Sequence, residues 1–118
     1  MYWIKVAKTA SVTNRNQKEK QVMHAVVNQL HFNKPVDEFR TALTDELLPL
    51  ITSLPGFTDF NYVKVSDDRA IVIIFWQDAA SAENGANTIG PTWFAENFAP
   101  YLASEQQRST GEVIVSSW

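Results

Sequence analysis

The chain has 118 residues, 45% of them hydrophobic, and its 10 basic and 13 acidic side chains give a formal net charge of −3. A chain of this length can bury one hydrophobic core, so we expect a single domain. It contains no cysteine, which excludes a disulfide framework, a cysteine-bearing metal site and a thiol nucleophile.

The apolar segments are too short to cross a membrane. The longest unbroken apolar run covers residues 70–76, whereas a membrane-spanning helix needs about 20 apolar residues. The first residues also lack the charged lead and apolar stretch of a secretory signal. We therefore expect a cytoplasmic protein with no membrane partner.

Positive charge is concentrated at the N-terminus. Residues 1–20 carry five basic side chains and one acidic side chain, a charge of +4, and the rest of the chain carries five basic and twelve acidic ones, a charge of −7. A basic arm can bind nucleic acid or an anionic membrane. Residues 13–20 are polar and without periodicity, however, which is typical of a solvated extension. We favour an N-terminal extension over residues 1–22, partly ordered at most, and no nucleic-acid partner.

The first regular pattern, over residues 22–32, predicts a strand with polar groups on both faces. Asn28 and Leu30 lie on one face, while Val27 and Gln29 lie on the other. Either one side of this strand lines a pocket and the other meets a partner sheet, or the strand is partly exposed.

Residues 35–54 predict an amphipathic helix. Pro35 suits the first helical position, and Pro49 removes a backbone hydrogen bond inside the helix, which predicts a kink near Asp45. The apolar residues recur at intervals of three and four, as expected for one buried face: Val36, Phe39, Leu43, Leu47, Leu50, Ile51 and Leu54.

The segment Leu54-Pro55-Gly56-Phe57 ends this helix and begins a strand, because Pro55 disfavours helical geometry at Leu54 and Gly56 can take a positive φ. Residues 57–65 and 70–76 then predict a hairpin with Asp67 and Asp68 in its turn. Paired aspartates can act as acid and base. The sequence shows no partner for these two, so a turn explains them better.

A second helix is expected to begin after Asp78, a suitable capping residue. We expect Gly85 and the Gly90-Pro91 pair to interrupt it and Thr92 to resume it. Its second half carries an aromatic face that we expect to pack on the sheet. Gly111 then opens the last predicted strand, residues 112–116.

The predicted order is βαββαβ, which is the ferredoxin-like α+β fold with an antiparallel sheet and two helices on one face. The third strand is apolar on both sides, so the sheet would expose a large apolar surface on the side away from the helices. A homodimer packed sheet to sheet would cover it, and dimers of this fold form an α+β barrel.

The sequence resembles the antibiotic biosynthesis monooxygenase-like family of dimeric α+β barrels over roughly residues 23–116, and we assign residues 23–118 to one domain of this type. The resemblance is carried by turns and strand ends: Leu54-Pro55-Gly56-Phe57, Phe75-Trp76-Gln77-Asp78-Ala79-Ala80 and Thr110-Gly111-Glu112-Val113. Such motifs indicate a fold more than a function. Some members of the family oxidise phenols or quinols with molecular oxygen and no cofactor, some degrade haem, and many have no demonstrated activity.

The resemblance implies a catalytic role for Asn28, because the segment Asn28-Gln29-Leu30-His31-Phe32 is similar to the first strand of the oxygenase branches. Its amide could hydrogen-bond a phenolate or dioxygen, or it could equally satisfy the backbone. A desolvating pocket for a small electron-rich aromatic substrate could come from the aromatic side chains: Trp76, Trp93, Phe94, Tyr62 and Tyr101.

Haem and metal chemistry fit the sequence poorly. Haem-degrading members add a tryptophan and a histidine in the second helix, whereas Gly85 or Ala86 falls near the tryptophan's place here and no histidine follows His31. His24 and His31 lie on opposite faces of one strand and cannot chelate one ion. Two interpretations remain: a cofactor-independent monooxygenase, or a noncatalytic homodimer that binds a small hydrophobic or aromatic ligand or serves a structural role.

Overall fold

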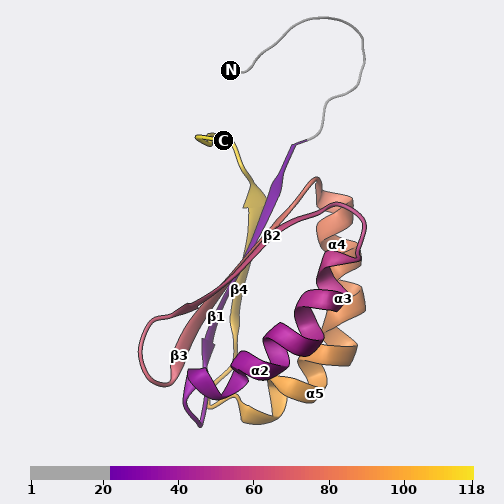
Figure 1. The fold of residues 1–118 in the computed structure, drawn as a ribbon. Coiled ribbons are helices and arrows are strands. Elements are labelled where there is room, and N and C mark those ends of the chain that lie inside the picture. Colours follow the sequence, from indigo (N-terminus) through magenta and orange to yellow (C-terminus); the bar gives the residue numbers. More distant parts are fainter. Residues whose placement is uncertain (1–21) are drawn as a thin grey trace, which may run out of the picture.

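The computed structural model describes residues 22–118, and within them one antiparallel sheet is covered on one face by helices (Figure 1). The strands are β1 (His24–His31), β2 (Phe57–Lys64), β3 (Arg69–Trp76) and β4 (Gln107–Glu112), in the order β2-β3-β1-β4. The predicted ferredoxin-like βαββαβ fold is confirmed. The extension expected over residues 1–22 lies outside the described residues, apart from Val22.

The first helical segment is continuous but changes its geometry along its length. It comprises η2 (Val36–Phe39, a 3₁₀ turn), α2 (Arg40–Ala42), η3 (Leu43–Leu47, a π-helical turn) and α3 (Leu48–Thr52). Pro49 has no N–H to offer the carbonyl of Asp45, and the wider π turn lies where the kink was expected. The predicted face is buried at Val36, Phe39, Leu43, Leu47 and Ile51.

The second helical segment comprises α4 (Ala79–Ile89), η4 (Gly90–Phe94, a π-helical turn), α5 (Ala95–Asn97) and η5 (Ala99–Tyr101). As predicted, Asp78 caps α4, and its Oδ1 accepts a 2.8 Å hydrogen bond from the Ser81 backbone N–H. The predicted break at Gly85 is wrong. Gly85 is buried inside α4, where its missing side chain lets the helix approach Trp76.

The last strand lies earlier in the chain than its apolar residues predicted. β4 pairs with β1 from Gln107 opposite Gln29 to Glu112 opposite His24, where β1 begins. After Glu112 the Val113 N–H donates a 2.9 Å hydrogen bond to the Met23 carbonyl, and Ile114 and Val115, past the start of β1, are 86% and 85% exposed. The prediction failed because β4 is an edge strand with polar side chains, which hydrophobic periodicity does not detect.

The turn between β2 and β3 contacts the end of β1. The carbonyl oxygens of Asp67 and Asp68 accept hydrogen bonds of 2.8 Å from the backbone N–H groups of Val36 and Phe32. The Asp68 carboxylate also lies 3.0 Å from Nε2 of His31, so it does have a partner, contrary to the expectation from the sequence. The pKa of Asp68 is held below its usual value, first by this hydrogen bond. These contacts support the interpretation as a turn.

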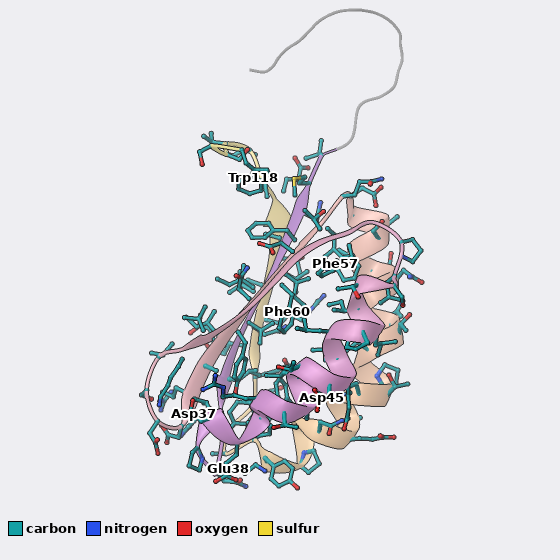
Figure 2. The ribbon with its side chains drawn as sticks, viewed as in Figure 1. Asp37, Glu38, Asp45, Phe57, Phe60 and Trp118 are labelled. Carbon is teal, nitrogen blue, oxygen red and sulfur yellow. The ribbon has the colours of Figure 1, made fainter. Side chains whose placement is uncertain are left out.

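The helices bury one face of the sheet around an aromatic cluster. Phe98 packs edge-on against Phe32 and Phe39, with ring centroids 5.1 Å and 5.0 Å apart. Figure 2 shows Phe57 and Phe60 of β2 in the layer between the sheet and the helices. Within residues 22–118, no helix is both long and apolar enough to cross a membrane.

The opposite face of the sheet, here called the outer face, is apolar at its centre. The alternation of β1 and β3 places five partly exposed apolar residues on it: Ala25, Val27, Ile71, Ile73 and Phe75. Trp118, beyond the end of β4 (Figure 2), packs on this face with its ring centroid 5.3 Å from that of Phe75. Trp118 itself remains 68% exposed.

Candidate functional site

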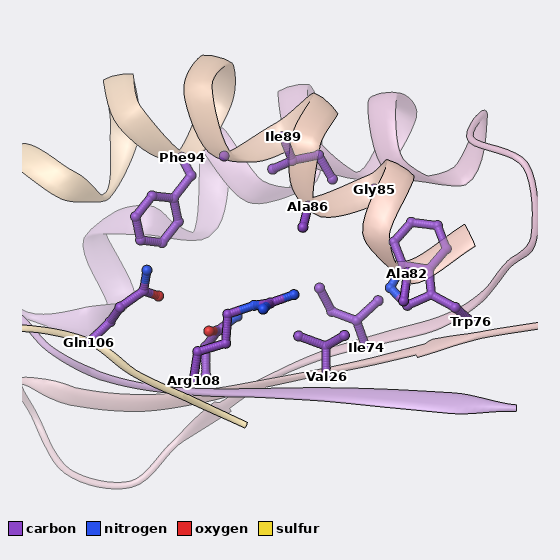
Figure 3. A pocket seen from close by; sticks show the side chains of 12 residues that line it. Val26, Ile74, Trp76, Ala82, Gly85, Ala86, Ile89, Phe94, Gln106 and Arg108 are labelled. Carbon is purple, nitrogen blue, oxygen red and sulfur yellow. The ribbon is translucent and has the colours of Figure 1, made fainter. Parts of the chain in front are cut away.

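A cavity of about 290 Å³ lies between the inner face of the sheet and the α4–η4 region (Figure 3). Its floor comes from β1, β3 and β4, and its roof comes from the second helical segment. The lining is mostly apolar and comprises Val26, Asn28, Ile74, Trp76, Ala82, Gly85, Ala86, Ile89, Gly90, Phe94, Gln106 and Arg108.

Asn28 is the polar centre of this floor. It lies in the middle of β1, opposite Val72 of β3 on one side and Arg108 of β4 on the other. Its Oδ1 atom is buried and has no hydrogen-bond partner among the described residues. Leaving a buried acceptor without a partner costs about 1–3 kcal/mol, so this atom is available to a ligand in the cavity.

A smaller cavity of about 60 Å³ continues from the first toward the aromatic cluster. The two cavities share Asn28, Ile74, Ile89 and Phe94. Asn28 therefore faces both of them, and the smaller one is almost entirely apolar. A flat hydrophobic ligand could contact both cavities while its polar group meets Asn28.

The structure brings together four of the six residues that the sequence suggested for the site. Trp76 and Phe94 line the larger cavity with Asn28, and Phe94 and Trp93 line the smaller one. Trp76 is only 1% exposed, so the cavity wall it forms is rigidly packed. The indole N–H of Trp93 donates a 3.2 Å hydrogen bond to Oε1 of Glu46, which fixes the ring.

Tyr62 and Tyr101 line neither cavity. The Tyr62 hydroxyl donates a 2.9 Å hydrogen bond to the backbone carbonyl of Val36, and burial raises the pKa of Tyr62 well above its usual value. Tyr101 packs against Phe39, and Nζ of Lys34 lies 3.9 Å from its ring centroid. Both tyrosines therefore have structural contacts at the opposite end of the helical layer.

Gln106 and Arg108 are the residues that sequence reasoning missed. They enter the site because the chain before and within β4, rather than the apolar run after it, runs beside β1. Among the described residues that line the cavity, Arg108 is the only ionisable one, and it makes no ion pair with any of residues 22–118. The sequence feature that could have identified Arg108 is its polar surroundings, because two glutamines precede it and a serine follows it.

The lining suits binding and orientation more than proton transfer. It offers an amide, a guanidinium and aromatic walls, and none of the described lining residues is a histidine or a carboxylate. His24 and His31 begin and end β1 outside this cavity, and no group of three or more potential metal-ligating side chains occurs within residues 22–118. Such a site can exclude water from an aromatic ligand and hydrogen-bond its polar substituents.

The sequence matches no protein-family model and no curated protein. Solved structures do share its fold. SnoaB, a cofactor-independent oxygenase from Streptomyces nogalater, is 13% identical with a TM-score of 0.67, over 80% of this chain and 96% of that one. A Nitrosomonas europaea protein of unknown function is 21% identical with a TM-score of 0.62, over 82% of this chain and 94% of that one.

A third structure, from Caulobacter crescentus, carries the provisional name antibiotic biosynthesis monooxygenase. It is 15% identical with a TM-score of 0.66, over 80% of this chain and 92% of that one. At these identities the likeness establishes the fold alone, and at that level the resemblance predicted from the sequence is confirmed. The chain thus has the ferredoxin-like α+β fold of the antibiotic biosynthesis monooxygenase-like proteins.

Proposed function

We propose that this protein is a cofactor-independent monooxygenase that acts on a small electron-rich aromatic substrate of the phenol or quinol type. The observation that carries the proposal is the buried, unpartnered Oδ1 of Asn28 in a cavity with aromatic walls. The fold supports it only in part, because one protein of this fold is a cofactor-independent oxygenase and another has no known function.

The reaction needs no redox cofactor because the substrate is itself the reductant. In the oxidation of a phenol to a quinone, the hydroxyl O–H bond and a ring C–H bond break. One atom of dioxygen forms a new ring carbonyl, and the other leaves as water with both hydrogens. The protein's contribution is then to hold the ring, to orient the substrate hydroxyl, and to exclude bulk water.

Asn28 would be the catalytic contact. Its Oδ1 accepts a hydrogen bond from the substrate hydroxyl and sets the ring against Phe94 and Trp76, while Trp93 closes the inner end of the site. Tyr62 and Tyr101, which line neither cavity, have no substrate contact in this proposal.

The test is oxygen uptake by the purified protein, without added cofactor, on a panel of hydroquinols and polyphenols. Asn28→Ala should lower kcat/KM by about 5- to 150-fold, the equivalent of about 1–3 kcal/mol for a hydrogen bond to a reacting group. Its free energy of unfolding should be unchanged or higher, since Asn28 Oδ1 has no protein partner to lose. A merely structural asparagine would show the opposite pattern.

The matched control is Asn87→Ala, which removes an exposed asparagine from α4 that lines neither cavity. This variant should retain full activity. Uptake no faster than in buffer across the whole panel would refute the monooxygenase proposal and favour the noncatalytic ligand-binding or structural homodimer.

We also propose that two chains pack through their outer faces to form a dimeric barrel. The supporting observation is the apolar centre of that face, around Ile73 and Phe75, which a single chain leaves partly exposed. Ile73→Asp should convert a dimer to a monomer in light scattering, whereas Thr41→Asp on the exposed side of α2 should not. A wild-type monomer at micromolar concentration would refute this proposal.

A further inference from the structure

We propose that the ligand of the cavity is an aromatic carboxylic acid, whose carboxylate binds Arg108 while its phenolic hydroxyl reaches Asn28. The inference names the substrate class of the proposed monooxygenase and in that sense rests on it. Its central claim concerns binding, however, and can be tested without turnover.

Arg108 and Asn28 form one binding edge across two strands. They are direct neighbours in the β1–β4 register, and side chains paired in this way have Cβ atoms about 4.5–5.5 Å apart on the same face of the sheet. Figure 3 shows the Arg108 side chain rising from β4 into the space below Ala86. The longer arginine therefore places its charge farther from the floor than the amide of Asn28.

The charge of Arg108 is unusual for its surroundings. Residues 22–118 carry five basic and twelve acidic side chains, yet the only ionisable group that they contribute to the cavity lining is this cation. Lys34 and Lys64 are paired with Glu38 and Asp37 at 3.8 Å and 2.8 Å, whereas the three arginines of residues 22–118 make no ion pair with a described residue, and of these only Arg108 lines the cavity. An uncompensated cation beside an apolar wall attracts an anion more strongly than the same charge in water.

A carboxylate matches this cation best. The planar guanidinium presents two parallel N–H groups that fit a carboxylate's two oxygens. A carboxylate is ionised at neutral pH, whereas a free phenol, with a pKa near that of tyrosine at about 10, is not. Arg108 is exposed, so it meets the ligand at the open end of the cavity, whereas Asn28 Oδ1 is buried at the floor.

The size of the cavity limits the ligand. About 290 Å³ is at the lower end of the range for ligand pockets, about 300–1,000 Å³. The arrangement thus fits one ring or two fused rings carrying a hydroxyl and a carboxylate at separated positions.

The experiment measures binding without oxygen, by calorimetry and by tryptophan fluorescence, since Trp76 and Trp93 line the two cavities. The probes are 2,5-dihydroxybenzoate, its methyl ester and hydroquinone. For the wild type, the acid should bind at least about tenfold more tightly than its ester, a difference of about 1.4 kcal/mol. Arg108→Gln should abolish that preference, and Arg108→Lys should keep part of it.

The matched control is Arg40→Gln, which removes the same charge from an exposed site on α2 that lines neither cavity. This variant should keep the preference for the acid. Circular dichroism should show that each variant is folded, as expected for substitutions of exposed side chains.

Three results would each overturn the inference: equal affinity for acid and ester, a preference for the acid that survives Arg108→Gln, or no binding of any probe. Its failure is separable from that of the proposed function. Preferential binding without oxygen uptake would retain the acid site and refute the monooxygenase. Oxidation of neutral quinols without any preference for the acid would retain the monooxygenase and refute the acid site.

Discussion

Replacing Gly85 with alanine tests how tightly α4 is packed on the wall of the cavity. A Cβ at Gly85 would lie 3.1 Å from Cε2 of Trp76 and closer still to its Cζ2 and Cη2 atoms. Trp76 cannot easily move away, because it is 1% exposed and packs edge-on against Phe57, with ring centroids 5.8 Å apart. The added methyl group must therefore displace either the indole or the helix.

Two effects of opposite sign contribute to the change in stability. Alanine is favoured over glycine inside a helix by about 1 kcal/mol. Overpacking a closely packed core costs about 1–3 kcal/mol. We therefore expect Gly85→Ala to be net destabilising by up to about 2 kcal/mol, against the usual direction for this substitution in a helix.

The assay is urea unfolding followed by circular dichroism, in wild-type and Trp76→Phe backgrounds. Phenylalanine lacks the outer ring atoms that the new Cβ would meet, so in that background Gly85→Ala should stabilise the protein by about 1 kcal/mol. Asn84→Ala, on the exposed side of α4, controls for helix propensity and should be slightly stabilising in both backgrounds. An equal stabilisation by Gly85→Ala in both backgrounds would refute the packing argument.

The remaining predictions concern a cap, a buried hydroxyl and the aromatic cluster. Asp78→Ala should lower the free energy of unfolding by about 1 kcal/mol at neutral pH. Because the Ser81 N–H lowers the pKa of Asp78, this stabilisation is present above the ordinary carboxyl pKa and is lost as the pH falls through the lowered value. A difference from wild type that persists in strong acid would contradict this explanation. Tyr62→Phe should cost about 1 kcal/mol through the lost bond to Val36 and leave oxygen uptake unchanged, whereas lost uptake would place Tyr62 in the site. Because the Tyr62 pKa is raised, its contribution to stability is present below the ordinary tyrosine pKa and should decline as the pH rises above that value. Phe98→Ala should cost about 3–5 kcal/mol, and a loss below 1.5 kcal/mol in urea unfolding would show that the cluster can collapse around the gap.

Much of the fold could be predicted because local chemistry and tertiary packing agree in most elements. The spacing of Phe39, Leu43 and Leu47 predicted the buried face of the first helix, and Gly56 takes the expected positive φ of 77°. Prediction failed where a contact between distant segments overrides local preference. Gly85 was predicted to interrupt the helix, yet it lies inside α4, where the close approach of Trp76 leaves no room for a side chain.

For the same reason, the sequence predicted only part of the candidate site. Asn28 was predicted through the resemblance to the oxygenase branches and Trp76 and Phe94 as aromatic side chains, and all three line the cavity. Tyr62 also points inward, but its hydrogen bond to Val36 depends on how β2 meets the first helix. No periodic pattern could have revealed that bond.

The sequence by itself determined the fold class, the order of the elements, the buried helix face and the cap at Asp78, because each follows from interactions within a few residues of the chain. Only the tertiary structure decided which segment pairs with β1. Strand pairing joins residues far apart in sequence, and the polar segment ending at Glu112 satisfies the edge of β1, while Ile114 and Val115 of the more apolar run after it stay exposed. That choice places Arg108 beside Asn28 and gives the cavity its charge.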